Sequence, residues 1–136
     1  MSFYTYDRYG GQHIYRSDAD ARAICEQLLR ELRHEEHYPE LDDEHTDVSL
    51  TCGDWAISVN VSGRVTLKNT AWVKSKNRRV AINSIPDLYM RDVPDEELVP
   101  LLYNLATGNH DSVLAAKWKT EDALASYVCD FYRQTQ

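Results

Sequence analysis

The stretch that decides the fold is Trp55–Asn69, which reads WAISVNVSGRVTLKN. Apolar residues alternate with small or polar residues as far as Val61, and the alternation resumes at Val65 after Ser62-Gly63. Alternation with a period of two is typical of a strand with one buried face, and a glycine-containing pair between two such runs favours a tight turn. The sequence therefore predicts a β-hairpin at this point.

Further strands are predicted on both sides of this hairpin, from short apolar runs bounded by turn residues. Gly10-Gly11 supplies a turn near the N-terminus, and Lys74–Asn77 supplies the turn of a second hairpin. These further strands are expected at Phe3–Tyr6, Gln12–Tyr15, Asp47–Thr51, Ala71–Val73 and Val80–Ile82.

Three helices are predicted from apolar residues at helical spacing. The first runs from about Asp18 to Glu36, the second begins at Pro94 and stops near Gly108, and the third begins at Thr120. Pro100 lies within the second helix, which either kinks there or ends and restarts. We therefore expect one α+β domain over residues 1–136, with an antiparallel sheet of about five to six strands and three helices packed mainly on one face.

The composition is that of a globular protein with an acidic surface. The chain has 136 residues, of which 43% are hydrophobic and 27% charged, and its formal net charge is −7. That charge disfavours general binding to nucleic-acid phosphates or to anionic lipid. No apolar run is long enough for a membrane span, and the first residues lack the pattern of a secretion signal. Cys25, Cys52 and Cys129 are scattered and form no CxxC pair, so we expect reduced thiols and a cytoplasmic location.

The charges in the middle of the chain are sorted by sign. No Lys or Arg occurs between Arg33 and Arg64, and no Asp or Glu occurs between Asp54 and Asp87. Separated blocks of charge can pair with each other or attract a partner of opposite charge. The sequence leaves open whether the two blocks contact each other. It nevertheless favours a protein that binds another macromolecule over one that transforms a substrate.

The acidic block is the first candidate for a binding surface. Its carboxylates would attract a basic protein, and Tyr38 would add an aromatic anchor. Four more tyrosines lie within the first fifteen residues and are candidates for the same role, since tyrosine offers apolar area with a polar tip. The predicted partner-binding residues are Tyr38, Glu40, Asp42, Asp43, Glu44 and Asp47, and the N-terminal tyrosines are Tyr4, Tyr6, Tyr9 and Tyr15.

The basic block supports an alternative, a nucleic-acid-associated regulator that uses the hairpin region 64–79. Interleaved cations and an aromatic side chain are typical of a surface that follows a phosphate backbone and stacks a base. The residues concerned are Lys68, Trp72, Lys74, Lys76, Arg78 and Arg79. The net negative charge of the chain makes nucleic acid the less favoured partner.

A second alternative is a small-ligand-binding protein or an enzyme with a cleft near His34, His37 and Cys52. The two histidines are three residues apart and do not form an HExxH motif, although with His45 they have metal-ligand chemistry. A polar helix end followed by an acidic loop explains them more simply. Cys52-Gly53-Asp54 is read as a turn between strands. We therefore predict no catalytic residue, no metal site and no cofactor.

The chain as a whole resembles the small immunity proteins of bacterial polymorphic-toxin and contact-dependent systems. The resemblance lies in a compact acidic α+β chain, in the hairpin GDWAISVNVSGRVTL from Gly53 to Leu67, and in a later helix that ends at Thr107-Gly108 before Trp118. It implies a cytosolic protein that binds a toxin domain and blocks its active site or substrate surface. It assigns no individual functional residue and leaves the partner and the oligomeric state open.

Overall fold

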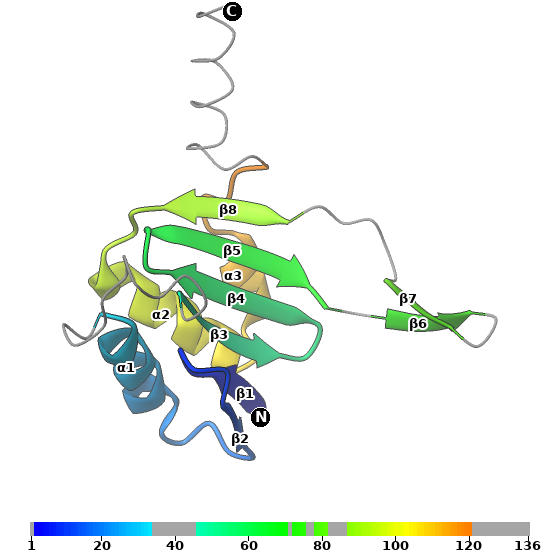
Figure 1. Ribbon diagram of the computed structural model, residues 1–136, viewed down its shortest axis with the longest axis horizontal. Helices are drawn as coiled ribbons and strands as arrows, with labels where there is room; N and C mark the ends of the chain where they lie inside the picture. The colour runs from blue at the N-terminus through cyan, green and yellow to red at the C-terminus, as the bar shows by residue number, and fades with distance from the viewer. Residues whose placement is uncertain (1, 34–45, 71, 76–77, 82–86, 121–136) are drawn as a thin grey trace, which may run out of the picture.

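The main sheet of the computed structural model has six antiparallel strands, and residues 2–33, 46–70, 72–75, 78–81 and 87–120 are described. The strands are β1 (Phe3–Tyr6), β2 (Gln12–Tyr15), β3 (Asp47–Cys52), β4 (Trp55–Asn60), β5 (Arg64–Asn69) and β8 (Leu88–Arg91). Their order in space is β2-β1-β3-β4-β5-β8 (Figure 1). The predicted α+β fold with an antiparallel sheet of this size is confirmed.

The second predicted hairpin forms, but it is not part of the main sheet. Its strands β6 (Trp72–Ser75) and β7 (Arg78–Ala81) pair only with each other and make a separate two-stranded sheet. Both strands are displaced from their predicted positions, so Lys74, expected in the turn, lies in β6. The sixth place in the main sheet belongs instead to β8, which the sequence analysis did not predict.

The turn between β4 and β5 requires glycine. Gly63 has a φ of 98°, a conformation that side chains with a Cβ rarely adopt. A Cβ at this position would also overlap the carboxylate of Asp92, whose backbone N–H donates to the Gly63 carbonyl at 2.9 Å. The turn is thus held against the segment that follows β8, which fixes this end of the β5–β8 pair.

The first helix, α1 (Ala21–Leu32), is shorter at its start than predicted. The residues before it form a turn of their own, in which the Ser17 hydroxyl accepts the N–H of Ala19 at 3.2 Å. That local bond competes with helix formation, so the helix begins at Ala21 rather than near Asp18. Its predicted end at Glu36 lies outside the described residues.

The second helix, α2 (Asp95–Ala106), is continuous through Pro100. Pro100 is exposed and lies in the second turn, where its missing N–H removes one bond to the first turn. A short third helix, α3 (His110–Leu114), follows and was not predicted. The helix predicted from Thr120 onward lies outside the described residues.

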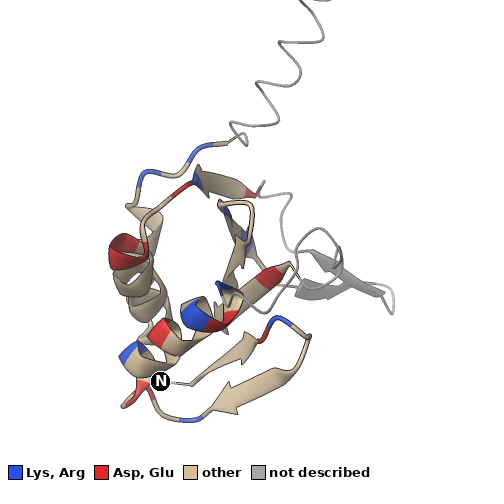
Figure 2. Ribbon diagram, turned by 60° about the vertical axis from the view of Figure 1, so that its left-hand side comes forward, with Lys and Arg blue, Asp and Glu red and all other residues tan. Residues whose placement is uncertain are grey.

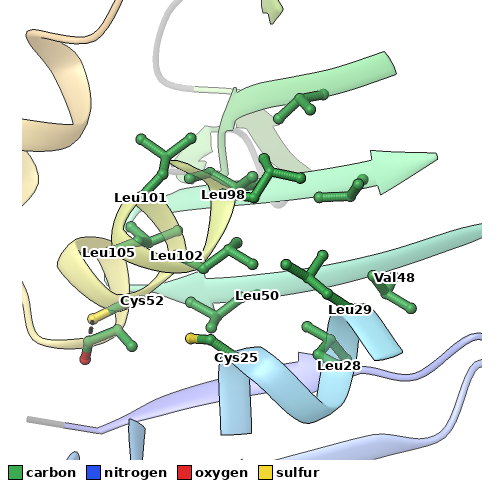
Figure 3. Close-up of a cluster of buried hydrophobic side chains, with 14 of the residues drawn as sticks. Cys25, Leu28, Leu29, Val48, Leu50, Cys52, Leu98, Leu101, Leu102 and Leu105 are labelled. Carbon is green, nitrogen blue, oxygen red and sulfur yellow. Dashed lines mark hydrogen bonds between the residues drawn. The ribbon is translucent and has the colours of Figure 1, made fainter. Parts of the chain in front are cut away.

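The core lies between the sheet and the helices α1 and α2. Helix α2 contacts β3 and β4, and α1 contacts β3 and α2. Figure 3 shows the leucines of α2 directed at the side chains of β3. The strands contribute every second residue to this core, as their alternation predicted, namely Val48, Leu50, Cys52, Ile57, Val59, Val65 and Leu67. No helix in the described ranges is both long and apolar enough to cross a bilayer.

Candidate functional site

Most of the predicted acidic binding segment lies outside the described residues. This applies to Tyr38 and to Glu40, Asp42, Asp43 and Glu44. Asp47 is described, and it is the exposed first residue of β3, where it is paired in register with Asn60 of β4. The amide of Asn60 donates to the Asp47 carboxylate. Of the predicted acidic residues, the structure therefore places Asp47 alone, at the start of β3.

The predicted basic surface is divided between the main sheet and the separate hairpin. Lys68 is exposed on β5, with its Nζ 3.9 Å from the Asp87 carboxylate. Trp72 and Lys74 lie in β6, Arg78 and Arg79 lie in β7, and Lys76 lies outside the described residues. The predicted basic residues that are described therefore lie on two separate sheets, Lys68 on the main sheet and the others on the β6–β7 hairpin.

The histidine and cysteine cluster is only partly described, and what is described is structural. His34, His37 and His45 lie outside the described ranges, and within those ranges no three His, Cys, Asp or Glu side chains are placed to hold a metal ion. Cys52 is 1% exposed, and its thiol donates to the carbonyls of Ser2 at 3.5 Å and Ala106 at 3.8 Å (Figure 3). Burial raises the pKa of the Cys52 thiol, which opposes formation of the reactive thiolate.

The face of the main sheet that points away from the core is a better candidate for a binding surface. The strand registers place alternate residues on this face, and none of them is among the buried aliphatic side chains. Its middle consists of small side chains, of which Thr51 is buried and Ser49, Ala56 and Ser58 are half-buried. Larger side chains border it on β1 and β2. We call this surface the tyrosine face and define it by Tyr4, Tyr6, Ile14, Ser49, Thr51, Ala56 and Ser58.

Three large side chains stand at the border of the tyrosine face. Tyr4 and Tyr6 are two residues apart on β1, and their rings meet edge to face with centroids 5.7 Å apart. Tyr6 is 40% exposed and Ile14 is 68% exposed. The Tyr6 hydroxyl accepts a hydrogen bond from the side chain of Gln12 at 3.2 Å. Tyr6 is therefore both accessible and held in place, which lowers the entropy it would lose on binding.

The opposite end of this face carries positive charge. Arg64 of β5 is paired in register with Arg91 of β8, and Lys68 lies further along β5 on the same face. Tyr89 of β8 lies on the same face, opposite Thr66 and two residues before Arg91. Helix α1 carries acidic and basic residues together (Figure 2), namely Arg22, Glu26, Arg30 and Glu31. The sequence analysis missed Tyr89 and Arg91 because it did not predict β8.

Comparisons of this chain with protein families, with curated proteins and with solved structures find no match.

Proposed function

We propose that this protein is a non-enzymatic binding protein, an inhibitor of the immunity type that acts in the cytoplasm on a basic protein such as a toxin domain. The observation that carries the proposal is the tyrosine face. It combines exposed aromatic and aliphatic side chains with a floor of small residues, and exposed apolar groups that border a polar surface are typical of protein-binding sites. The buried, hydrogen-bonded thiol of Cys52 supports a binding role over nucleophilic catalysis.

Charge supports a basic partner. The net charge of −7 attracts a cationic protein over distances of about a Debye length, near 8 Å at physiological salt. Of the acidic residues in 40–47, Asp47 is described, and it lies at the start of β3, two residues before Ser49 of the tyrosine face. In this proposal the acidic residues speed the encounter, and the tyrosines provide the close contact.

Co-expression tests the proposal directly. The product of each neighbouring open reading frame is expressed with and without this protein in a growth assay, followed by co-purification. Restored growth together with a stable complex would support the immunity-type function. If neither neighbouring product is toxic, and neither co-purifies with this protein, the immunity-type function is wrong.

Replacing Tyr6 tests the tyrosine face. We expect Tyr6→Ala to weaken binding to the partner about tenfold, because an exposed aromatic anchor commonly contributes 1–2 kcal/mol or more to an interface. Tyr103→Ala is the matched control, since Tyr103 on α2 is also 40% exposed but lies outside this face. Calorimetric titration of both variants gives the comparison, and equal affinities for the two would remove the tyrosine face from the interface.

Neutralising the acidic segment tests its proposed role in association. We expect Glu40→Gln, Asp42→Asn and Asp43→Asn together to lower the association rate constant several-fold at low salt and to flatten its salt dependence. The control changes Glu26, Glu96 and Glu97 to Gln, which alters the net charge equally on exposed helix positions. Stopped-flow measurement at two salt concentrations distinguishes them. An unchanged rate in the first variant would contradict the role of this segment.

The cluster of Arg64, Lys68 and Arg91 favours nucleic-acid binding as a second candidate function. These cations share one sheet face with Tyr89, and exposed sheet faces with aromatic and basic side chains can bind single strands. Retention on heparin that is lost when Arg64 and Arg91 become Glu would support this second function over the first.

A further inference from the structure

A pocket of about 300 Å³ lies on the other side of the β1–β2 hairpin, between that hairpin and α1. The inward-facing residues of the two strands line one side of it and the residues of α1 line the other. We call it the hairpin–helix pocket. Its volume is at the lower limit for ligand sites, which suits a single side chain or a small molecule better than a large cofactor.

One wall of the pocket is apolar. Ile24 and Leu28 come from α1, and Leu28 is 5% exposed. Tyr15 comes from β2, and its ring stacks on that of Phe3 with centroids 5.0 Å apart. This wall can bury an aliphatic stem of a few methylene groups, at roughly 0.8 kcal/mol for each fully buried group.

The rest of the lining is polar and carries two carboxylates, those of Asp7 and Glu31. Within the described ranges Glu31 accepts one long hydrogen bond, from the backbone N–H of Arg8 at 3.3 Å, so acceptor capacity remains for a ligand. Thr5 also lines the pocket and is 2% exposed.

The charges around the pocket favour a cation. His13 contacts the Asp7 carboxylate through Nε2 at 2.8 Å and offsets one negative charge when it is protonated. Arg8 is not among the lining residues, and its guanidinium donates to the carbonyl of Leu32 at 2.7 Å. With His13 neutral, the lining itself carries two negative charges and no positive one.

We propose that the hairpin–helix pocket binds a cationic group on an aliphatic stem, the chemistry of a lysine or arginine side chain. The stem lies along Ile24, Leu28 and Tyr15, and the cation meets the carboxylate of Glu31. Two sources can supply this cationic group, a side chain of the basic partner or a free small amine. Only the first source rests on the proposed function.

A titration with n-butylguanidinium tests the proposal without any partner. Amide shifts of the isotope-labelled protein are followed by NMR, with n-butanol and butyrate as matched probes that lack the positive charge. We expect shifts at His13, Ile24 and Glu31 with n-butylguanidinium, and much weaker effects with the other two. Absent shifts, shifts confined to other regions, or equal binding of n-butanol would overturn the proposal.

Two variants on α1 make the test specific. Glu31→Gln removes the charge from the pocket, and we expect it to weaken n-butylguanidinium binding about tenfold, as loss of a charge-assisted hydrogen bond does. Glu26→Gln is the control, because Glu26 is exposed on the same helix and pairs with Arg22 at 3.4 Å. Equal affinities for the two variants would overturn the assignment of the cation to Glu31.

A blocked tripeptide, acetyl-Gly-Arg-Gly-amide, distinguishes the two sources of the cation. Binding of the tripeptide at the same residues would support a side chain of a protein partner. Binding of n-butylguanidinium alone would overturn that source and assign the pocket to a small amine. Because neither probe requires the partner, failure of this proposal is distinguishable from failure of the proposed function.

Discussion

Leu102→Ala is expected to lower the free energy of unfolding by about 3–4 kcal/mol. Leu102 is 0% exposed and lies in the middle of α2, directed at the sheet beside Leu50 (Figure 3). Its truncation removes buried methyl and methylene groups and leaves a cavity that rigid strands cannot fill, a change that typically costs 2–5 kcal/mol. Urea unfolding followed by circular dichroism measures the difference.

Leu114→Ala is the matched control for that experiment, since Leu114 is 41% exposed on α3. We expect it to change the unfolding free energy much less than Leu102→Ala does. Comparable losses for the two variants would contradict the description of α2 as the element that seals the core over β3 and β4.

Asp7→Ala is expected to lower the free energy of unfolding by about 2 kcal/mol at neutral pH. The Asp7 carboxylate closes the β1–β2 turn by accepting the N–H groups of Tyr9 and Gly11, both at 2.9 Å, and it also contacts His13. Alanine leaves these donors without their acceptor. The pocket described above would lose one of its two carboxylates at the same time.

The effect of Asp7→Ala is expected to depend on pH. Burial alone would raise the pKa of Asp7, but the hydrogen bonds from His13, Gly11 and Tyr9 outweigh burial and lower the pKa below its usual value. A carboxyl group with a lowered native pKa stabilises the fold above its unfolded-state pKa, and this stability is lost as pH falls through the native pKa. The difference between wild type and variant should therefore be full at pH 7 and shrink below about pH 4.

Unfolding of both proteins at pH 7 and at pH 3 measures this dependence. Asp20→Ala serves as the control, because Asp20 makes no side-chain capping bond to α1. A difference between wild type and Asp7→Ala that grew on acidification would contradict the charge-assisted turn.

Local patterns predicted most of the sheet because the central strands β3, β4 and β5 bury alternate aliphatic residues. The strands β1 and β2 have their predicted bounds, and the Trp55–Asn69 hairpin forms around Gly63. The strand β8 was missed because Leu88, Tyr89 and Met90 are consecutive large side chains that show no alternation, and only their register with β5 makes them a strand. The helix α3 was missed because it has five residues, of which Val113 alone is buried.

The hairpin–helix pocket could not be predicted from spacing along the chain. Its carboxylates lie in the first turn and near the end of α1, and only the packing of the helix against the hairpin brings Asp7, His13 and Glu31 to one cavity. A weaker signal was present, because strand alternation puts Thr5, His13 and Tyr15 on the same side as buried Phe3. The tyrosine face was easier to predict from the sequence, because the N-terminal tyrosines already indicated contact with a partner.

The chain leaves the main sheet after β5 and returns to it at β8. The residues of the main sheet are constrained by its packing, whereas the segment between these two strands is free to change. Leu67 and Leu88 are paired partners, so the excursion between them starts and returns at points about 5 Å apart, and the Lys68–Asp87 ion pair lies across its base. Because β6 and β7 pair only with each other, lengthening this excursion costs the sheet little, about 0.6 kcal/mol for each doubling. In evolution, the β6–β7 hairpin can therefore gain or exchange charged residues while the main sheet keeps its sequence.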